Sequence, residues 1–277
     1  MTSGPLDKDS MWLFRSLVYL WLLIYALHTI PLLDMFYGAE SVMMPRIPKS
    51  SGTIQNVLYM LNYTKERAVW VLAVHIITCL MALTGVLGWL PRILVWFTGW
   101  MLYYGCIPSY NGGYLLMLMF SFYCIPFSFL SRWVPSNVAA NLGYLASRWQ
   151  VILVYVIAGY YKLTGEDWMD GSAIGRTLYL EAFVSDFTRN TLFQVPFFLK
   201  ALTWVGLFYQ VTFPFVIWFK RVKIPFLLIG LGFHLGISIV LGLWDFGTAM
   251  IIGYVLFWNP SLEMWKNKWP WFRKALG

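Results

Sequence analysis

Charged side chains are scarce in this chain: they make up 12% of its 277 residues, whereas hydrophobic residues make up 60%. A water-soluble globule of this size needs far more polar surface than that composition supplies. Apolar stretches of about 20 residues, the length that a spanning helix requires, follow one another along the chain. The sequence therefore predicts an all-α polytopic membrane protein.

Cysteine is rare as well, and Cys79, Cys106 and Cys124 all fall within apolar stretches. None of them lies in a Cys-x-x-Cys motif or in a cysteine–histidine spacing typical of zinc sites. We therefore expect neither a disulfide framework nor a metal site, and we interpret the thiols as packing residues. Segments of about ten strictly alternating residues, which indicate a transmembrane β-barrel, are also missing.

The apolar stretches predict about eight spanning helices in a single membrane domain over residues 1–277, without a separate soluble or substrate-binding domain. Two connections are long, residues 34–67 and 164–194, and short interfacial helices are expected within them at Ile54–Leu61 and Arg176–Phe183. The expected spanning helices are Met11–Leu33, Ala68–Leu90, Ile93–Ser109, Tyr114–Leu130, Gly143–Leu163, Val195–Phe219, Ile224–Leu243 and Gly247–Trp258.

The distribution of positive charge predicts that both termini are cytoplasmic. The short outer turns, residues 111–113 and the turn around Asp245, contain no lysine or arginine. Long outer connections do contain some, but long segments count for less in this rule. The net charge of +8 is spread over the breaks between apolar stretches, which favours contact with lipid head groups over nucleic acid. The expected cytoplasmic cations are Lys8, Arg92, Arg132, Lys220, Arg221, Lys223, Lys266, Lys268, Arg273 and Lys274.

Ionisable side chains within spanning segments are costly unless they are paired or hydrated, so each one is a candidate functional residue. Arg15 and Arg148 lie near expected cytoplasmic helix ends, where they could reach anionic head groups or form a structural ion pair. His28 and His75 fall in the outer halves of the first two expected helices. A histidine in such a helix is more often a hydrogen-bonded core residue than a ligand.

Lys162 and His234 are the candidate catalytic residues. Lys162 ends the fifth expected helix and is followed closely by Asp167 and Trp168. It is either an interfacial anchor within an aromatic belt that includes Tyr161, or an amine that an apolar pocket keeps neutral and able to accept a proton. His234 lies in the middle of an otherwise apolar segment, and core packing and a functional role are equally open for it.

A short polar stretch, Ser109-Tyr110-Asn111-Gly112-Gly113-Tyr114, joins the third and fourth expected helices. It can be a simple tight turn, because Asn-Gly and Gly-Gly readily adopt the positive φ that such turns need. It also places the amide of Asn111 on the same expected face as Lys162. Asn111, Tyr161, Asp167, Trp168, His28 and His75 are therefore candidates for a pocket in the outer half of the bundle.

Four motifs occur in a recognisable order along the chain. They are Asp9-Ser10-Met-Trp-Leu-Phe14-Arg15, then Asn111-Gly-Gly-Tyr114, then Ala158-Gly159-Tyr-Tyr-Lys162-Leu with Asp167-Trp168-Met-Asp170-Gly171, and finally Phe233-His234 followed by Phe246. Together they resemble the membrane domain of vitamin K-dependent gamma-carboxylase and its bacterial relatives, the horizontally transferred transmembrane (HTTM) family. The resemblance extends over about residues 8–260.

This resemblance implies an enzyme that uses a reduced quinone, oxygen and carbon dioxide. In the carboxylase, a lysine at the position of Lys162 deprotonates vitamin K hydroquinone, and the product of its reaction with oxygen removes a γ-proton from a glutamate. The resulting carbanion captures carbon dioxide, and His234 is the expected orienter or proton relay. The chain departs from the family at Gly112, where the family has an important histidine, for which His28, His75 or Asn111 could substitute.

A second departure concerns substrate recognition. Only about 19 residues follow Trp258, where the carboxylase has a large lumenal domain, so we do not expect docking of propeptide-bearing substrates. Stand-alone members of this size resemble SdpB-type bacterial proteins, which accompany the maturation or export of secreted peptide toxins. The chain is therefore expected to be an enzyme that modifies a peptide or lipid at the outer face of a bacterial inner membrane. The alternative is a non-catalytic accessory protein for maturation, export or immunity of a secreted peptide, acting with a small partner protein.

Overall fold

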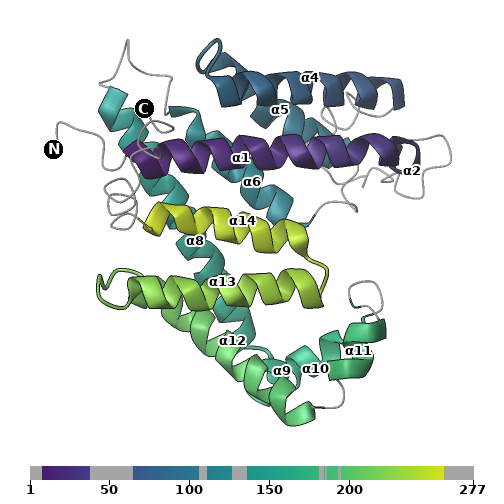
Figure 1. Cartoon of the computed structure of the whole chain (residues 1–277), viewed down its shortest axis with the longest axis vertical. Coiled ribbons are helices and arrows are strands. Elements are labelled where there is room, and N and C mark those ends of the chain that lie inside the picture. The colour runs from purple at the N-terminus through teal and green to yellow at the C-terminus, as the bar shows by residue number, and fades with distance from the viewer. Residues whose placement is uncertain are drawn as a thin grey trace, which may run out of the picture. The chain divides into compact units, whose positions relative to one another are not determined.

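A computed structural model describes residues 8–37, 65–105, 111–126, 136–180, 184, 186–192 and 195–258. Within these ranges all regular elements are helices, as Figure 1 shows, which confirms the all-α prediction. Four helical segments in the described part are long and apolar enough to cross a membrane. The described helices therefore support a helical membrane bundle, and the number of eight spans stays a prediction. The four segments are Asp9–Tyr37, Lys65–Thr84, Val138–Leu163 and Lys223–Val240.

Large apolar side chains lie exposed along these helices. On helix α12 (Pro196–Val216), Phe197, Phe208 and Phe215 are 86%, 69% and 68% exposed, and in helix α4 (Lys65–Thr84) Trp70 is 73% exposed. A soluble protein of this size rarely exposes so many large apolar groups together. Helices that face hydrocarbon tails expose large apolar groups without a free-energy penalty, so the exposed surface agrees with a membrane environment.

The chain divides into two compact units. The first unit comprises residues 1–147 and 259–277, and the second comprises residues 148–258. Helix α8 (Ser136–Leu163) begins in the first unit and continues into the second.

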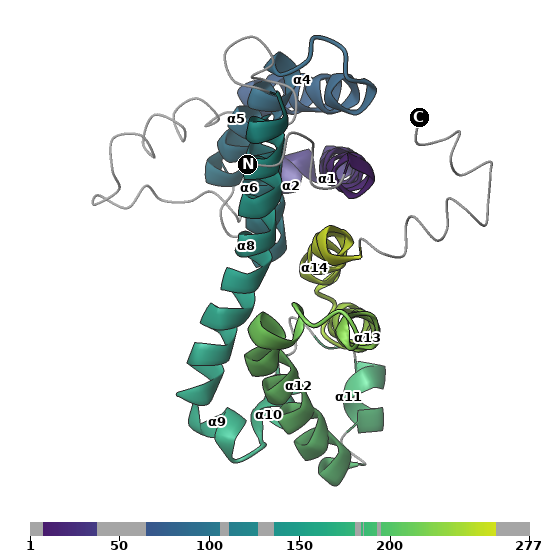
Figure 2. The same ribbon diagram turned by 90° about the vertical axis from the view of Figure 1, so that its left-hand side faces the viewer.

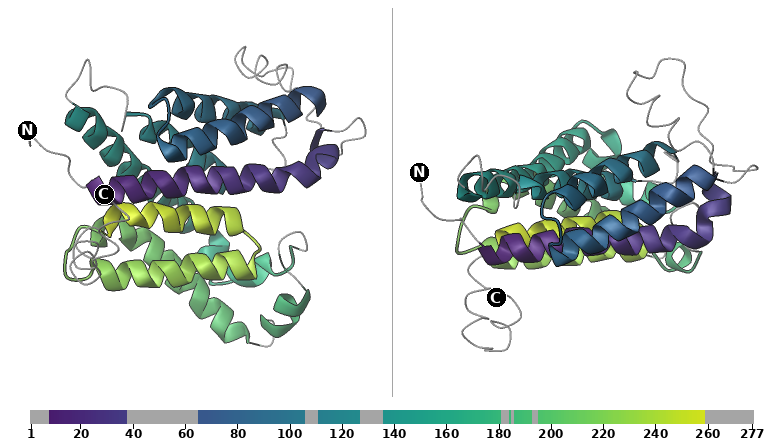
Figure 3. Two further views of the ribbon diagram at one scale, coloured as in Figure 1. Left: turned by 45° about the horizontal axis from the view of Figure 1, so that its top comes forward. Right: turned by 90° about the horizontal axis from the view of Figure 1, so that it is seen from above.

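The first unit is built around four long helices that pack against one another. Helix α1 contacts α4 and α6, and α5 contacts both α4 and α6 (Figure 2 and Figure 3). The hydroxyl of Tyr37 donates a hydrogen bond to the carbonyl of Leu102 at 3.0 Å, which ties the end of α2 to α5. The elements are α1 (Lys8–Thr29), the 3-10 turn η1 (Ile30–Leu32), α2 (Leu33–Tyr37), α4, α5 (Leu90–Gly105) and α6 (Gly112–Cys124).

The end of the second expected helix differs from the observed end for a local reason. The sequence predicts that the second helix ends at Leu90, but α4 ends at Thr84 because Gly85, Leu87 and Gly88 have φ values of 79°, 57° and 59°. Such left-handed residues cannot continue a right-handed helix. The turn they form is followed directly by α5.

The Asn-Gly-Gly stretch is not the positive-φ turn that its sequence suggested. Gly112 and Gly113 form the first turn of α6, and neither has a positive φ. The side chain of Asn111 accepts a hydrogen bond from the N–H of Gly113 at 2.8 Å, so Asn111 is the N-cap of the helix. Asn111 therefore has a structural role that accounts for its polarity. The expected interfacial helix at Ile54–Leu61 lies outside the described residues.

In the second unit, three further helices, α12, α13 and α14, lie to one side of the C-terminal part of α8 (Figure 2). Helices α13 and α14 run side by side in opposite directions, joined by a turn in which Gly242 has a φ of 65° (Figure 1 and Figure 2). Helix α12 packs against α13 and against the short helices α9 and α10. The elements are α9 (Glu166–Met169), α10 (Ala173–Thr177), α11 (Asp186–Leu192), α12, α13 (Lys223–Val240), α14 (Trp244–Tyr254) and the 3-10 turn η3 (Val255–Phe257).

Two predictions for the second unit need correction. The short helix expected at Arg176–Phe183 is wrong in its position, because α10 ends at Thr177 and a turn follows. The sequence predicts that the sixth helix ends at Phe219, but α12 ends at Val216. Pro214 lacks the N–H that would bond to the carbonyl four residues earlier, which weakens the last turn of this helix.

Gly171 offers a test of the packing around α9 and α10. Its φ is 84°, and a Cβ atom there would lie 2.5 Å from Cγ of Lys200. We expect Gly171→Ala to lower the free energy of unfolding by about 1–3 kcal/mol, because a strained backbone and a steric conflict add together. Thermal unfolding of the purified protein in detergent measures this. Gly175→Ala is the matched control, since its Cβ would meet no atom within 4 Å. Equal midpoints for the two variants would contradict the prediction.

Candidate functional site

Lys162 lies near the C-terminal end of α8 with its amine between two uncharged groups. Its Nζ donates a hydrogen bond to Oε1 of Gln210 at 2.7 Å and lies 4.4 Å from the centre of the Trp168 ring. No carboxylate of the described residues lies within 4.0 Å of it. A lysine in an apolar bundle is normally held by an acidic partner. Here the amine is positioned by neutral groups instead.

The face of α8 that carries Lys162 also carries Tyr155 and Gly159. Steps of four and three residues put these three positions on one side of a helix, and seven residues rise by about 10 Å. A Cβ atom on Gly159 would lie 3.4 Å from Cγ2 of Val211, so this side of α8 packs closely against α12. Gln210 on α12 therefore comes within reach of Lys162.

About two helical turns before Lys162, buried hydroxyl groups form a continuous hydrogen-bonded chain. The hydroxyl of Tyr155 lies 2.7 Å from Nε2 of His234 and also bonds to the hydroxyl of Tyr254. The hydroxyl of Tyr254 lies 2.9 Å from that of Tyr209. Tyr155, Tyr209 and Tyr254 are at most 3% exposed and His234 is 1% exposed. We call these four residues the tyrosine–histidine chain; it connects α8, α12, α13 and α14.

Small residues on α13 and α14 make room for this chain. Gly230 and Ser238 lie one turn either side of His234, and all three are buried. A Cβ atom on Gly230 would collide with the hydroxyls of Tyr209 and Tyr254. Gly247 on α14 similarly leaves space for the hydroxyl of Ser238, which donates to the backbone carbonyl of His234 at 2.9 Å. The small residues therefore set how closely the helices approach.

Only one of the two ring nitrogens of His234 has a hydrogen-bond partner among the described residues. Its Nε2 contacts Tyr155, but Nδ1 is buried and has no hydrogen-bond partner among the described residues. Leaving such an atom unpaired costs about 1–3 kcal/mol. Phe233 and Phe246 lie around the ring, with ring centres 5.1 and 5.8 Å away. Native proteins seldom leave a buried polar atom unpaired, so this one calls for a functional explanation.

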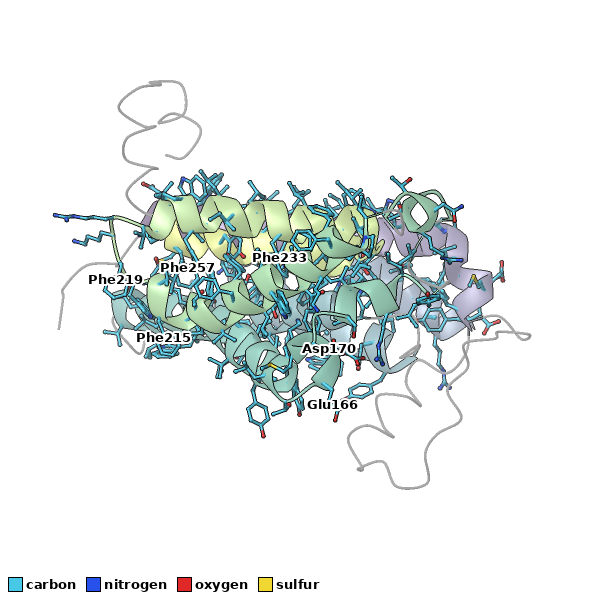
Figure 4. The ribbon with its side chains drawn as sticks, turned by 90° about the horizontal axis from the view of Figure 1, so that it is seen from below. Glu166, Asp170, Phe215, Phe219, Phe233 and Phe257 are labelled. Carbon is cyan, nitrogen blue, oxygen red and sulfur yellow. The ribbon has the colours of Figure 1, made fainter. Side chains whose placement is uncertain are left out.

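The acidic stretch after α8 lies at one end of the second unit. Figure 4 shows Glu166 and Asp170 at that end, Phe219 at the other end, and Phe233 between them. Lys162 precedes Glu166 by four residues, across the end of α8, whereas His234 follows Phe233 directly.

Comparison with known proteins adds no assignment. No family model matches the chain, and no curated protein or solved structure matches it either. The chemistry of the second unit therefore has to be argued from its own residues. Among the described residues, no group of three or more histidines, cysteines, aspartates or glutamates is placed to hold a metal ion.

The remaining candidates in the second unit have different surroundings. Asp167 forms a salt bridge with Arg176 at 3.0 Å, on the surface, where such pairs contribute little stability. Tyr161 is 69% exposed, unlike the buried tyrosines of the tyrosine–histidine chain. The guanidinium of Arg148 lies over the rings of Trp218 and Phe257, 4.9 and 4.8 Å from their centres.

Four other candidates belong to the first unit. His28 is exposed near the end of α1. His75 is buried, and its Nδ1 lies 2.7 Å from Oγ1 of Thr98, which agrees with a hydrogen-bonded core histidine. Arg15 lies within electrostatic range of another arginine, Arg92, and has no salt bridge with a described carboxylate. Asn111 is the N-cap described above.

Sequence reasoning missed four polar residues at the site: Gln210, Tyr155, Tyr209 and Tyr254. Tyrosines are abundant in this chain, and nothing in the local sequence separates these three from the exposed ones. One signal was present, because Tyr155 lies seven residues before Lys162 and so shares its helix face. Gln210 is a rare uncharged polar group within an apolar stretch, and it could have been singled out on that ground.

Gly230 provides a test of the tyrosine–histidine chain. We expect Gly230→Ala to lower the free energy of unfolding by about 1–3 kcal/mol, because the added methyl group must displace two hydrogen-bonded hydroxyls. Gly232→Ala, in the same helix, is the control: its Cβ would meet no atom within 4 Å, and alanine favours a helix. Thermal unfolding in detergent compares the two. A Gly230→Ala protein as stable as the control would show that the hydroxyls are not packed this closely.

Proposed function

We propose that this chain is a membrane enzyme that uses a reduced quinone to modify a peptide or lipid, with Lys162 as the general base. The observation that carries the proposal is the neutral surroundings of the amine. Gln210 and Trp168 hold Nζ in place without a negative charge, so they favour the ammonium form far less than a carboxylate would. A lysine can act as a base only when it is neutral for part of the time.

The residues of the second unit fit a quinol. A quinol has phenolic hydroxyl groups on an aromatic ring, often with an apolar tail. Lys162 offers a proton acceptor, and the buried Nδ1 of His234 offers a polar contact among the rings of Phe233 and Phe246. When bound, a reduced quinone supplies an acidic hydroxyl and two electrons for the reduction of oxygen.

The roles of the protein groups follow from their contacts. Nζ of Lys162 accepts a proton from a phenolic hydroxyl and becomes an ammonium group. Oε1 of Gln210 then accepts a hydrogen bond from the ammonium, and the face of the Trp168 ring stabilises its charge. Capture of carbon dioxide by a carbanion of the substrate, as in the carboxylase, is the reaction that the motif resemblance adds to this proposal.

Removing the amine tests the proposal directly. We expect Lys162→Met to lower quinol-dependent oxygen consumption about a hundredfold or more, the usual loss when a general base is removed. The purified protein in nanodiscs is assayed with an oxygen electrode. The control is Lys200→Met, which removes a lysine that lies 5.0 Å from the ring centre of Trp204 but is exposed.

The outcome also separates the two candidate functions. An equal loss of oxygen consumption in both variants would indicate a general effect of removing positive charge. If the wild-type protein binds no quinol, the proposal of a quinol-dependent enzyme is wrong. In that case the accessory role for a secreted peptide becomes the working hypothesis, and capture of a partner chain the next experiment.

Gln210 allows a finer test by pH. We expect Gln210→Glu to move the activity profile to higher pH by about one to three units, because a carboxylate beside the amine favours its charged form. The Lys162 amine then loses its proton only at a higher pH. Gln210→Leu removes the same hydrogen bond without adding charge, so its profile should not move upward. An unchanged profile in Gln210→Glu would contradict the assignment of Lys162 as the base.

A further inference from the structure

Arg15 on α1 carries a positive charge that no described residue of the first unit neutralises. Its Nε is buried without a hydrogen-bond partner, and its guanidinium forms no salt bridge with a described carboxylate. Arg148 differs, because its guanidinium lies over two aromatic rings. Arg15 makes no such ring contact among the described residues. An arginine in an apolar helix is costly unless it is paired or hydrated, so Arg15 calls for a partner.

A second arginine, Arg92 on α5, adds to this positive charge. Arg92 is 2% exposed, and its Nη1 donates a hydrogen bond to the backbone carbonyl of Cys124 at 3.4 Å. Arg15 lies within electrostatic range of both Arg92 and Cys124. Two guanidinium groups from different helices therefore lie near each other beside the end of α6. Their repulsion is strong where little water screens it.

The nearby helix ends do not cancel this charge. Cys124 is the last residue of α6, and the C-terminal end of a helix carries about half a negative charge. Arg92 is the third residue of α5, and the N-terminal end of a helix carries about half a positive charge. These two ends offset each other, so an excess of positive charge remains around the two arginines. Such a region favours an anion.

The surroundings of Arg15 favour an anion that is carried by a lipid. Arg15 is partly exposed, so an anion reaches it from the surface of α1 and needs no cavity in the bundle. Trp12, three residues earlier, is 39% exposed, and Leu20, five residues later, is 42% exposed. Tryptophan is enriched at the level of lipid head groups, and arginine forms paired hydrogen bonds with phosphate. Arg15 thus combines a phosphate-binding group with a flanking apolar surface.

We propose that Arg15, supported by the charge of Arg92, binds the phosphate group of an anionic phospholipid beside the N-terminal half of α1. Arg15 donates hydrogen bonds to the phosphate oxygens, whereas Arg92 stays bonded to Cys124 and contributes attraction through its charge. Phosphatidylcholine binds more weakly, because its head group brings a positive charge of its own. This inference is independent of the proposed function, which concerns residues of the second unit.

Native mass spectrometry of the full-length protein tests the lipid site. Delipidated protein in detergent is titrated separately with phosphatidylglycerol, phosphatidylcholine and inorganic phosphate, and the affinity of the tightest binding event is measured. We expect the wild type to bind phosphatidylglycerol about tenfold or more tightly than phosphatidylcholine, because two arginines each attract the net negative charge. We expect inorganic phosphate to bind more weakly than phosphatidylglycerol, because it has no acyl chains to cover the apolar surface of α1.

Three variants separate a specific site from general attraction. We expect Arg15→Gln to weaken binding of phosphatidylglycerol about tenfold or more, the usual effect of losing hydrogen bonds to a charged group, and to abolish the preference over phosphatidylcholine. Arg15→Lys keeps the charge without the paired donors and should lie between Arg15→Gln and the wild type. Arg221→Gln is the control, since it removes an equal charge from an exposed turn between α12 and α13 and should keep the preference. Thermal unfolding verifies that each variant is folded.

The results that would overturn the inference are distinct. Equal affinity of the wild type for the two lipids, or an equal loss in Arg15→Gln and Arg221→Gln, would show that Arg15 forms no specific site. Inorganic phosphate that binds as tightly as phosphatidylglycerol would show that the ligand is not a lipid. If Arg15→Gln does not fold, the comparison of Arg15→Lys with the wild type decides, and an unchanged affinity there contradicts the paired hydrogen bonds.

Discussion

Hydrogen bonding between buried hydroxyl groups is the interaction on which the second unit depends. Water is scarce in the interior of a membrane protein, so a polar side chain must find its partner within the protein or lose the free energy of that bond. Tyr155, Tyr209, Tyr254 and His234 solve this by bonding to one another, and each comes from a different helix. Because the bonds tolerate little displacement, they fix the spacing of the four helices, and Gly230 is small enough to allow it.

The same constraint explains why the polar groups at the site are few and ordered. An amine, an amide and an imidazole replace the charged pairs that are common in water-soluble enzymes. Lys162 is held by Gln210 and Trp168, which carry no charge, so the amine can change protonation state without leaving an isolated carboxylate behind. A buried ion pair would instead need both charges to be kept in place. Neutral partners are thus compatible with both stability and proton transfer.

Not every polar residue in an apolar helix takes part in binding or catalysis. Asn111 caps a helix, and His75 is hydrogen-bonded to Thr98, so both have their polar groups used within the fold. His234 differs because one ring nitrogen is left over. The distinction is visible only when all donors and acceptors around a side chain are counted, since burial alone does not separate His75 from His234.

The sequence by itself determined the helical class and the membrane environment. Its apolar stretches of about 20 residues have the length of spanning helices, and a helix satisfies its own backbone hydrogen bonds in lipid. It also singled out Lys162 and His234, since ionisable groups stand out against an apolar background. Helix ends at Thr84 and Val216 were misplaced, because left-handed φ values and a late proline act locally within a still apolar stretch. Only the tertiary structure decided the partners of the site residues. Gln210 bonds to Lys162 although the two are 48 residues apart in the sequence, because such contacts depend on how the helices pack and not on local spacing.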